Sequence, residues 1–255
     1  MGKNMNEQTE KKNVFLPEKK KMEALGRLSC KVAHDFNNIL GAIEGYATLA
    51  LNAARADDPV REDLREIRNS VAKAAALGKQ LMAFGGRQML RKAPCDVNGL
   101  IEKTLKREEL AAGGAFKIEA RLEPGLPGIM ADAGQLEQAL ANLLVNAKEA
   151  MPGGGAAAVT SGAVRLEGGA VNSPKPEEAG TLFVRISVAD SGAGISPENL
   201  EHLFEPLFTV VKKGAGAGLG LAAVYGLVKQ HNGWVEVKSE PGRGSEFVLF
   251  LPAEN

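Results

Sequence analysis

The chain has 255 residues, of which 44% are hydrophobic and 24% are charged, a composition that excludes a wholly disordered chain. Its 31 basic and 31 acidic side chains balance, so the net charge gives no reason to expect a nucleic acid or an anionic membrane as a partner. Glycine is over-represented, with 30 residues, and most of them follow Met151.

Two cysteines, Cys30 and Cys95, are too few for a disulfide framework or a four-thiolate zinc site. No apolar stretch reaches the ~18 residues that a membrane span needs, and the polar residues 1–21 lack the apolar region of a signal peptide. We therefore expect a cytoplasmic protein with reduced thiols and no membrane segment in this chain. Residues 1–21 are expected to be a linker or tail.

Residues 22–92 are predicted to form two helices, because apolar side chains recur at steps of three and four residues. The second series starts after Pro59, a residue that suits the first turn of a helix. The first stripe consists of Leu25, Leu28, Val32, Phe36, Ile39, Ile43 and Tyr46, and the second of Val60, Leu64, Ile67, Val71, Ala74, Gly78 and Leu81. One antiparallel hairpin cannot enclose its own apolar stripe, so we expect two copies to pair as a four-helix bundle in a homodimer.

Residues 93–255 mix strands with helices. The patterns predict helices over 97–110, 135–150, 197–203 and 219–230. They predict strands over 116–122, 156–166, 182–188, 234–237 and 246–251. This order favours an α/β sandwich, in which helices cover one face of a sheet.

The first helix carries His34 and Asn38 one turn apart on a flank that faces water, with Asp35 beside them. A neighbouring carboxylate holds an imidazole in one tautomer and makes it a better nucleophile or base. Taken alone, a histidine on a helix surface is more often merely solvated, so the pattern gains meaning only from the motifs that follow it.

The helix over 135–150 places Asn142 and Asn146 one turn apart among apolar residues. Amide oxygens are hard, neutral ligands that suit a Mg²⁺ ion which keeps several waters and substrate phosphates. Amides that bond locally on the helix surface are the alternative interpretation of this pair.

Two glycine-containing motifs come later in the chain. The first lies directly after an apolar strand and contains Asp190, Gly192 and Gly194. In such a motif the carboxylate can accept a hydrogen bond from an exocyclic amine, and the glycines let the backbone approach a planar base. Alternate residues of 214–220 are glycine and lead into an apolar helix, so backbone N–H groups there can meet phosphate. This loop is neither a Walker A sequence nor a Rossmann fingerprint, and an ordinary strand-ending turn is the alternative for the Asp190 motif.

The four motifs in this order indicate a protein family far more specifically than any one motif does. With it, the sequence resembles a sensor histidine kinase, in which a dimerisation and phosphotransfer hairpin precedes a GHKL-type ATP-binding domain. The resemblance covers about residues 22–252, and its stretches VAHDFNNIL, LANLLVNAKEAM and GLGLAAVYGLVKQHNGW look like the subgroup of nitrogen-regulatory kinases. It implies a phosphotransfer domain over 22–92 and a catalytic ATP-binding domain over 93–255.

The resemblance assigns roles to the hairpin residues. His34 would attack the γ-phosphate of ATP, and Asp35 would orient the ring and take up its proton. The phosphoryl group would pass to an Asp in the receiver domain of a response regulator. Asn38 would position water when the kinase dephosphorylates that regulator.

The resemblance also implies ATP and Mg²⁺ as cofactors. On the metal and phosphate side it assigns Asn142, Asn146 as the direct Mg²⁺ ligand, Lys148, Gly216, Gly218 and Gly220. On the base side it assigns Asp190, which would read the adenine amino group, together with Gly192, Gly194 and Ser245.

The lid before Gly218 departs from the family pattern, since Val210, Val211 and Ala217 stand where the subgroup has Thr, Lys and Thr. Each lost charge-assisted hydrogen bond to phosphate costs about 1.5–3 kcal/mol, which puts the autokinase rate in doubt. A nucleotide-binding dimeric scaffold with weak or no autokinase activity is therefore the main alternative. A mechanical ATPase of the same superfamily and a pure interaction module are the others.

Overall fold

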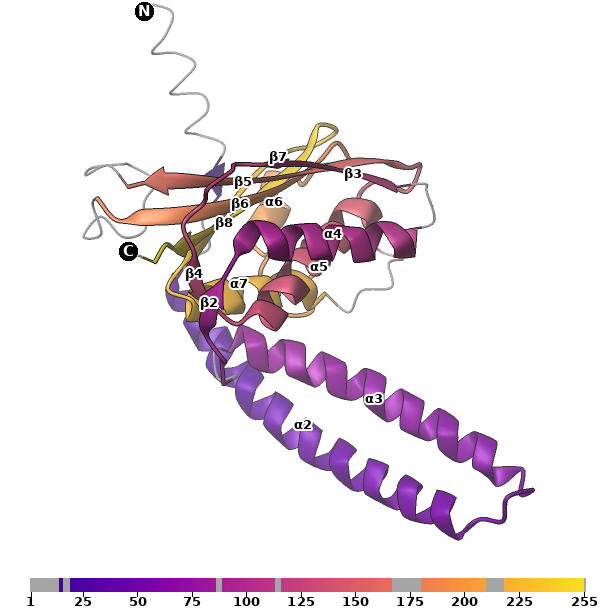
Figure 1. Cartoon of the computed structure of the whole chain (residues 1–255). Helices are drawn as coiled ribbons and strands as arrows, with labels where there is room; N and C mark the ends of the chain where they lie inside the picture. The colour runs from indigo at the N-terminus through magenta and orange to yellow at the C-terminus, as the bar shows by residue number, and fades with distance from the viewer. Residues whose placement is uncertain are drawn as a thin grey trace, which may run out of the picture.

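The computed structural model describes residues 14–15, 19–85, 89–112, 116–166, 180–209 and 218–254. Two long helices, α2 (Lys19–Ala53) and α3 (Val60–Phe84), run antiparallel and form the predicted hairpin, which projects from one end of an α/β unit (Figure 1). The Arg61 guanidinium fixes the connection between them by donating to the carbonyls of Leu51 and Ala54, at 2.8 and 2.9 Å. Within the described ranges, no helix is both long and apolar enough to span a bilayer.

The two helices contact each other through three small residues and two larger aliphatic ones. Ala33, Leu40 and Ala47 of α2 and Val71 and Gly78 of α3 are buried. The larger apolar side chains point elsewhere, and all of the following are between 41% and 75% exposed: Leu28, Val32, Phe36, Ile39, Ile43 and Tyr46. In a single copy, the predicted stripe therefore lies outside the contact between α2 and α3.

The remaining elements belong to the α/β unit, apart from β1 (Val14–Phe15), which precedes the hairpin. Its helices are α4 (Val97–Ala112), α5 (Ala133–Glu149), α6 (Pro197–Leu200) and α7 (Gly220–Gln230). Its strands are β2 (Ala93–Cys95), β3 (Phe116–Leu122), β4 (Ile129–Ala131), β5 (Gly155–Arg165), β6 (Leu182–Asp190), β7 (Trp234–Glu240) and β8 (Gly244–Pro252).

Among the described residues, six strands form a sheet in the order β1-β7-β8-β6-β5-β3, with β3 and β5 parallel and the other neighbours antiparallel. Strands β2 and β4 form a separate antiparallel pair. Helices α4, α5 and α7 cover one face of the sheet (Figure 1), and the main core lies between them and the sheet, around Leu136, Leu140, Val188, Val224 and Leu249. The predicted α/β sandwich is confirmed.

The sequence does not predict three short strands, β1, β2 and β4. Each has two or three residues, too few to show an alternating pattern, and each is defined by a partner far away in the chain. Strand β1 lies in the stretch expected to be a linker and pairs with Val237 and Lys238 of β7. Helix α2 also begins inside that stretch, at Lys19.

The base of the hairpin packs directly against the α/β unit. Phe84 at the end of α3 is buried in the main core, with its ring centroid 6.4 Å from that of Tyr225. Gly226 of α7 permits this approach, because a Cβ atom there would clash with the backbone of Ala83 and Phe84. The Gln230 side chain then donates to the Ala83 carbonyl at 3.2 Å. The close approach of α3 to α7 therefore requires glycine at position 226.

Candidate functional site

A cavity of about 480 Å³ lies where the end of β6 and the start of β8 meet α5 and the N-terminus of α7. Seven of the ten predicted nucleotide residues line it: Asn142, Asn146, Asp190, Gly194, Gly218, Gly220 and Ser245. The structure thus brings together residues that are more than 100 positions apart in the chain.

At one end of the cavity, Asp190 is half-buried and lies directly opposite Ser245 on the neighbouring strand. Its Oδ1 accepts the backbone N–H of Gly192 at 2.8 Å. Burial raises the pKa of the Asp190 carboxyl, and the backbone N–H groups of Gly192 and Ser245 oppose that shift. A Cβ atom at Gly192 would press on the carbonyl of Ala150, and Gly194 has a positive φ of 66°. A carboxylate beside such open backbone can accept a hydrogen bond from the amine of a planar base.

The opposite wall is α5, whose N-terminus is capped by the Asp132 side chain, which accepts the N–H of Gln135 at 3.2 Å. Asn142 is fixed by two hydrogen bonds: its Nδ2 donates to the Gly220 carbonyl at 3.3 Å, and its Oδ1 accepts from the Gln138 side chain at 3.1 Å. Asn146, one turn later, differs from Asn142. Its Nδ2 is buried and has no hydrogen-bond partner in the described part of the chain.

This unpaired amide fits a site that a ligand completes. Across the described residues, no group of three or more His, Cys, Asp or Glu side chains is placed to hold a metal ion by itself. A neutral amide oxygen together with phosphate oxygens and water is the donor set that Mg²⁺ accepts. The residues present therefore fit Mg²⁺ held at Asn146 together with a nucleotide, with Nδ2 of Asn146 free to donate to a phosphate oxygen.

Gly218 and Gly220 border the cavity where α7 begins. Gly218 has a positive φ of 67°, and a Cβ atom there would press on the backbone of residues 207–208. The first N–H groups of α7 have no acceptor within the helix, which suits a phosphate. The remaining lid positions, Gly216, Val210, Val211 and Ala217, lie outside the described residues.

Lys148 does not line the cavity. It follows Asn146 by two residues, a rotation of about 200° on an α-helix, which turns it to the other side of α5. Lys148 is exposed and is not among the residues that line the cavity, so its contact with a triphosphate stays a prediction. Val145 and Glu149, which flank the Asn146 side of the helix, line the cavity instead.

Two cavity residues come from the hairpin and have no signal in the sequence. Leu77 and Gln80 of α3 lie at the border of the cavity, on the side of Asn142 and Asn146. Their position follows from the docking of α3 against α7, which local patterns do not reveal. Thr209 also lines the cavity, and residues 204–208 directly before it (FEPLF) are the sequence signal that could have marked this segment.

His34, Asp35 and Asn38 form a second site, on the hairpin. The His34 and Asp35 side chains are 70% and 67% exposed. Nδ1 of His34 lies 3.3 Å from Oδ1 of Asp35 and 3.5 Å from Nδ2 of Asn38. The two contacts belong to different tautomers, since Nδ1 donates to Asp35 when it carries the proton and accepts from Asn38 when it does not. In the tautomer that pairs with Asp35, which is the shorter contact, the Nε2 lone pair is available to attack an electrophile.

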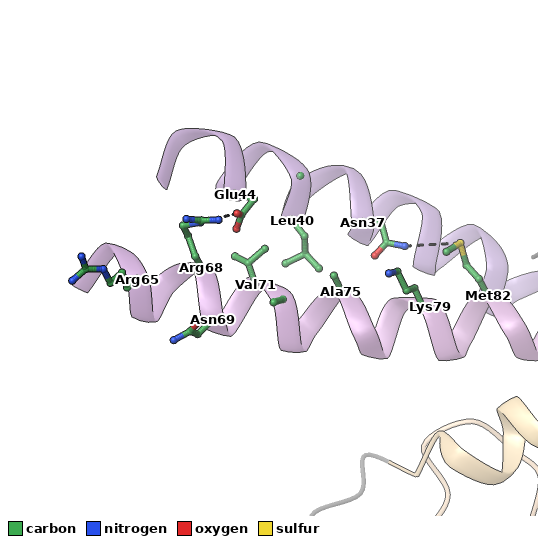
Figure 2. Close-up of a pocket in the computed structure, with 12 residues that line it drawn as sticks. Asn37, Leu40, Glu44, Arg65, Arg68, Asn69, Val71, Ala75, Lys79 and Met82 are labelled. Carbon is green, nitrogen blue, oxygen red and sulfur yellow. Dashed lines mark hydrogen bonds and ion pairs between the residues drawn. The ribbon is translucent and has the colours of Figure 1, made fainter. Parts of the chain in front are cut away.

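A groove of about 550 Å³ runs between α2 and α3, and its first residue on α2, Asn37, comes three residues after His34. Gly41, which lies two helical turns after His34, lines the groove and has open space above its backbone. Figure 2 shows its charged side chains: Glu44 is paired to Arg68 at 2.8 Å, and Lys79 lies further along α3, close to Asn37 and Met82. An open, charged groove therefore adjoins the exposed histidine.

Comparisons with known proteins agree with this geometry. Residues 131–255 match the family described as "Histidine kinase-, DNA gyrase B-, and HSP90-like ATPase". The chain is 39% identical over 240 residues to the sensor kinase CckA of Brucella abortus, which covers 93% of this chain and 25% of CckA. It is 32% identical over 225 residues to the sensory histidine kinase/phosphatase NtrB of Rhodobacter capsulatus, which covers 87% of this chain and 60% of NtrB. The chain thus spans only part of the length of these curated relatives.

A solved structure extends the likeness to the hairpin. Full-length ShkA in complex with AMPPNP matches with a TM-score of 0.63 and 28% identity, over 90% of this chain and 46% of ShkA. Because the aligned residues include both the hairpin and the α/β unit, the likeness is not confined to the nucleotide fold. The chain is thus similar to sensor histidine kinases over most of its length, and residues 131–255 match the histidine kinase-, DNA gyrase B- and HSP90-like ATPase family.

Proposed function

We propose that this chain is an ATP-dependent protein-histidine kinase that phosphorylates His34 and passes the phosphoryl group to an Asp of a response regulator. One observation carries the proposal: a cavity of about 480 Å³ that both Asp190 and Asn146 line occurs in the same chain as an exposed imidazole whose Nδ1 lies 3.3 Å from Oδ1 of Asp35. The AMPPNP bound to ShkA and the names of the relatives support it.

In the proposed reaction, Nε2 of His34 attacks the γ-phosphorus of ATP, and the N–P bond forms as the bond to ADP breaks. The proton stays on Nδ1, where the Asp35 carboxylate stabilises the positive charge of the ring and then takes up the proton. Such a transfer depends on in-line positioning more than on covalent help. His34 lies on the hairpin and the cavity lies mainly on the α/β unit, so in the proposed reaction the two units bring the histidine and the γ-phosphate together.

The cavity residues would position the nucleotide. Asp190 would accept the adenine amine, and Asn142 would hold the start of α7 in place through its bond to Gly220. Asn146 would hold Mg²⁺, which neutralises phosphate charge when it is bound.

Incubation with γ-labelled ATP tests the kinase proposal. The wild-type chain and a His202→Ala control, which removes another exposed histidine, should acquire an acid-labile label. The His34→Ala variant should acquire none. ADP binding without any label in the wild type would contradict the kinase and favour the scaffold alternative, which the lid residues Val210, Val211 and Ala217 motivate.

We also propose that the receiver domain docks on the groove below His34, and that Asn38 positions water when the phosphorylated regulator is hydrolysed. The groove supports this by its place beside His34 and by the open space above Gly41. Gly41→Arg should block phosphoryl transfer to the regulator and leave labelling of His34 intact. Asn52→Arg, on an exposed part of α2 outside the groove, should leave both reactions intact. Equal transfer by both variants would contradict the docking site.

A homodimer is part of the same proposal. The exposed stripe of Leu28, Val32, Phe36, Ile39, Ile43 and Tyr46 supports it, because a helix face with this many large apolar side chains is stabilised when a partner covers it. A second copy offers the same stripe, so two hairpins would complete a four-helix bundle.

A further inference from the structure

Three side chains lie in one row across the sheet at the base end of the cavity. Ser239 of β7 is directly opposite Ser245 of β8, and Ser245 is directly opposite Asp190 of β6. Residues directly opposite one another point to the same face of a sheet, here the face covered by helices. Asp190 and Ser245 line the nucleotide cavity, whereas Ser239 lies behind them and borders the outer surface.

The Ser239 hydroxyl has three polar neighbours. It lies 2.9 Å from the Gly244 carbonyl, 2.8 Å from the backbone N–H of Ile195 and 2.9 Å from Oγ of Ser245. A hydroxyl group has one proton to donate and two lone pairs that accept. The carbonyl of Gly244 only accepts and the N–H of Ile195 only donates. All three contacts are therefore satisfied only when Ser239 donates to Gly244 and Ser245 donates to Ser239.

This assignment determines what Ser245 presents to the cavity. Its proton is directed back to Ser239, so only the lone pairs of its Oγ remain for a ligand. The neighbouring Asp190 carboxylate, when ionised, also only accepts. The base end of the cavity therefore offers two acceptors side by side.

We propose that Ser239 is a positioning residue that makes Ser245 an obligate acceptor, and that this arrangement selects purines with a 6-amino group over purines with a 6-oxo group. A 6-amino group has two N–H donors, one for Asp190 and one for Ser245. A 6-oxo group is an acceptor and would face two acceptors, which is unfavourable when water is excluded. The inference rests on the proposed nucleotide-binding function and adds Ser239, which does not touch the nucleotide.

The backbone around Ser239 keeps this geometry fixed. Gly244 has a positive φ of 90°, and a Cβ atom there would clash with the Asp190 backbone, so the Gly244 carbonyl is held in place. The N–H of Gly242 donates to the Ala193 carbonyl at 2.7 Å, which ties the β7–β8 turn to the loop that carries Ile195. Ser239 therefore has a second, purely structural role, and the experiment must separate the two.

The test compares three diphosphates in calorimetric titrations: ADP, inosine diphosphate with a 6-oxo group, and purine riboside diphosphate with no 6-substituent. The wild type should bind ADP more tightly than the other two. In Ser239→Ala the Ser245 hydroxyl is free to donate, so the ADP-to-inosine-diphosphate affinity ratio should fall roughly three- to tenfold, the effect of one hydrogen bond. Purine riboside diphosphate should bind nearly as it does to the wild type.

Further variants keep the result interpretable. Ser239→Thr retains the hydroxyl and should restore the ratio, and Ser245→Ala should lower the ratio as Ser239→Ala does. Ser187→Ala removes a buried serine on the opposite face of the sheet, bonded to Glu246 at 2.8 Å, and should leave the ratio unchanged. An unchanged ratio in Ser239→Ala, or an equal loss for all three nucleotides, would overturn the proposal. A wild type that binds none of them would overturn the nucleotide-binding function itself, which is a different result.

Discussion

Nδ2 of Asn146 is the atom at the nucleotide cavity with the clearest need for a ligand, since it is buried and unpaired within the described residues. Asn146→Ala removes both this donor and the proposed Mg²⁺ ligand. ADP binding with Mg²⁺ should weaken by about tenfold or more, because a hydrogen bond to a charged group is worth about 1.5–3 kcal/mol. The loss should be smaller in excess EDTA, where Asp190 still holds the base. Calorimetry with and without Mg²⁺ measures both effects.

Asn69→Ala is the matched control. Asn69 is an exposed asparagine on α3 that donates to Glu66 at 3.2 Å and does not line the nucleotide cavity. It should leave ADP binding unchanged. If Asn146→Ala kept the full Mg²⁺ dependence of the wild type, the assignment of Asn146 would be wrong.

The residues of the nucleotide cavity are predictable from sequence where the 3.6-residue period of a helix decides the direction of their side chains. Asn142 and Asn146 are one helical turn apart, and both line the cavity as expected. The same period explains why Lys148 does not, since two residues rotate a side chain by about 200°. Leu77 and Gln80 could not be found in this way, because their place at the cavity comes from the packing of one unit against the other.

At the scale of elements, the N-terminus of α5 is a junction of several segments. The backbone N–H of Asp132 donates to Nε2 of His231 at 3.1 Å, and Oδ2 of Asp132 accepts the N–H of Arg91 at 2.9 Å. Nδ1 of His231 donates to the Leu227 carbonyl at 2.9 Å, so both ring nitrogens are used and the imidazole is neutral. The ring thus joins the end of α7 to the start of the helix that carries Asn146.

This junction predicts a dependence of stability on pH. Burial lowers the pKa of His231; Lys92 lowers it further, whereas the bond to Leu227 and the charge of Asp132 raise it. The unfolded chain therefore binds the proton at higher pH than the folded chain, and stability is lost as pH falls below the ordinary histidine value of about 6.5. Urea unfolding between pH 8 and 5 should show this fall in the wild type, and it should be smaller in His231→Gln. His202→Gln, at an exposed histidine, should keep the wild-type slope; equal slopes in all three proteins would contradict the prediction.

Elements differ in how well the sequence predicts them. Helices α2, α3, α4 and α5 follow from apolar periodicity, which is a property of the segment itself. Strand β2 has three residues and exists through its pairing with β4, more than 30 positions later. A segment this short has no period of its own, so only the tertiary structure defines it.

For the whole molecule, the exposed stripe on α2 predicts association. Ile39 is 60% exposed in a single copy and would lie inside a bundle of two hairpins. Ile39→Glu should weaken the dimer by at least about a hundredfold, because a buried, unpaired carboxylate costs several kcal/mol. Sedimentation velocity measures this, with Met89→Glu as a control at a residue that is 92% exposed. A monomeric wild type, or an Ile39→Glu variant that stays dimeric, would contradict the proposed bundle.

The hairpin packs against the α/β unit at Gly226, and this contact predicts a coupling between the two sites. A Cβ atom there has no room because its neighbours are backbone atoms of Ala83 and Phe84, which cannot rotate away as a side chain can. Gly226→Ala should therefore displace α3 and leave α7 intact, since alanine stabilises a helix by about 0.5–1 kcal/mol relative to glycine. Hydrogen exchange should accelerate at residues 82–84, and ADP should bind differently because Leu77 and Gln80 leave the cavity wall.

The control for this prediction is Gly153→Ala, at a glycine with open space around it and no positive φ. It should change neither the exchange at residues 82–84 nor the affinity for ADP. Faster exchange in Gly226→Ala with unchanged ADP affinity would mean that the hairpin docks on the α/β unit without contributing to the nucleotide site. Unchanged exchange at residues 82–84 would mean that the substitution displaces α7 and leaves α3 in place. Any coupling between the two sites would then depend on another contact, such as the ion pair of Lys21 with Glu205 at 2.5 Å.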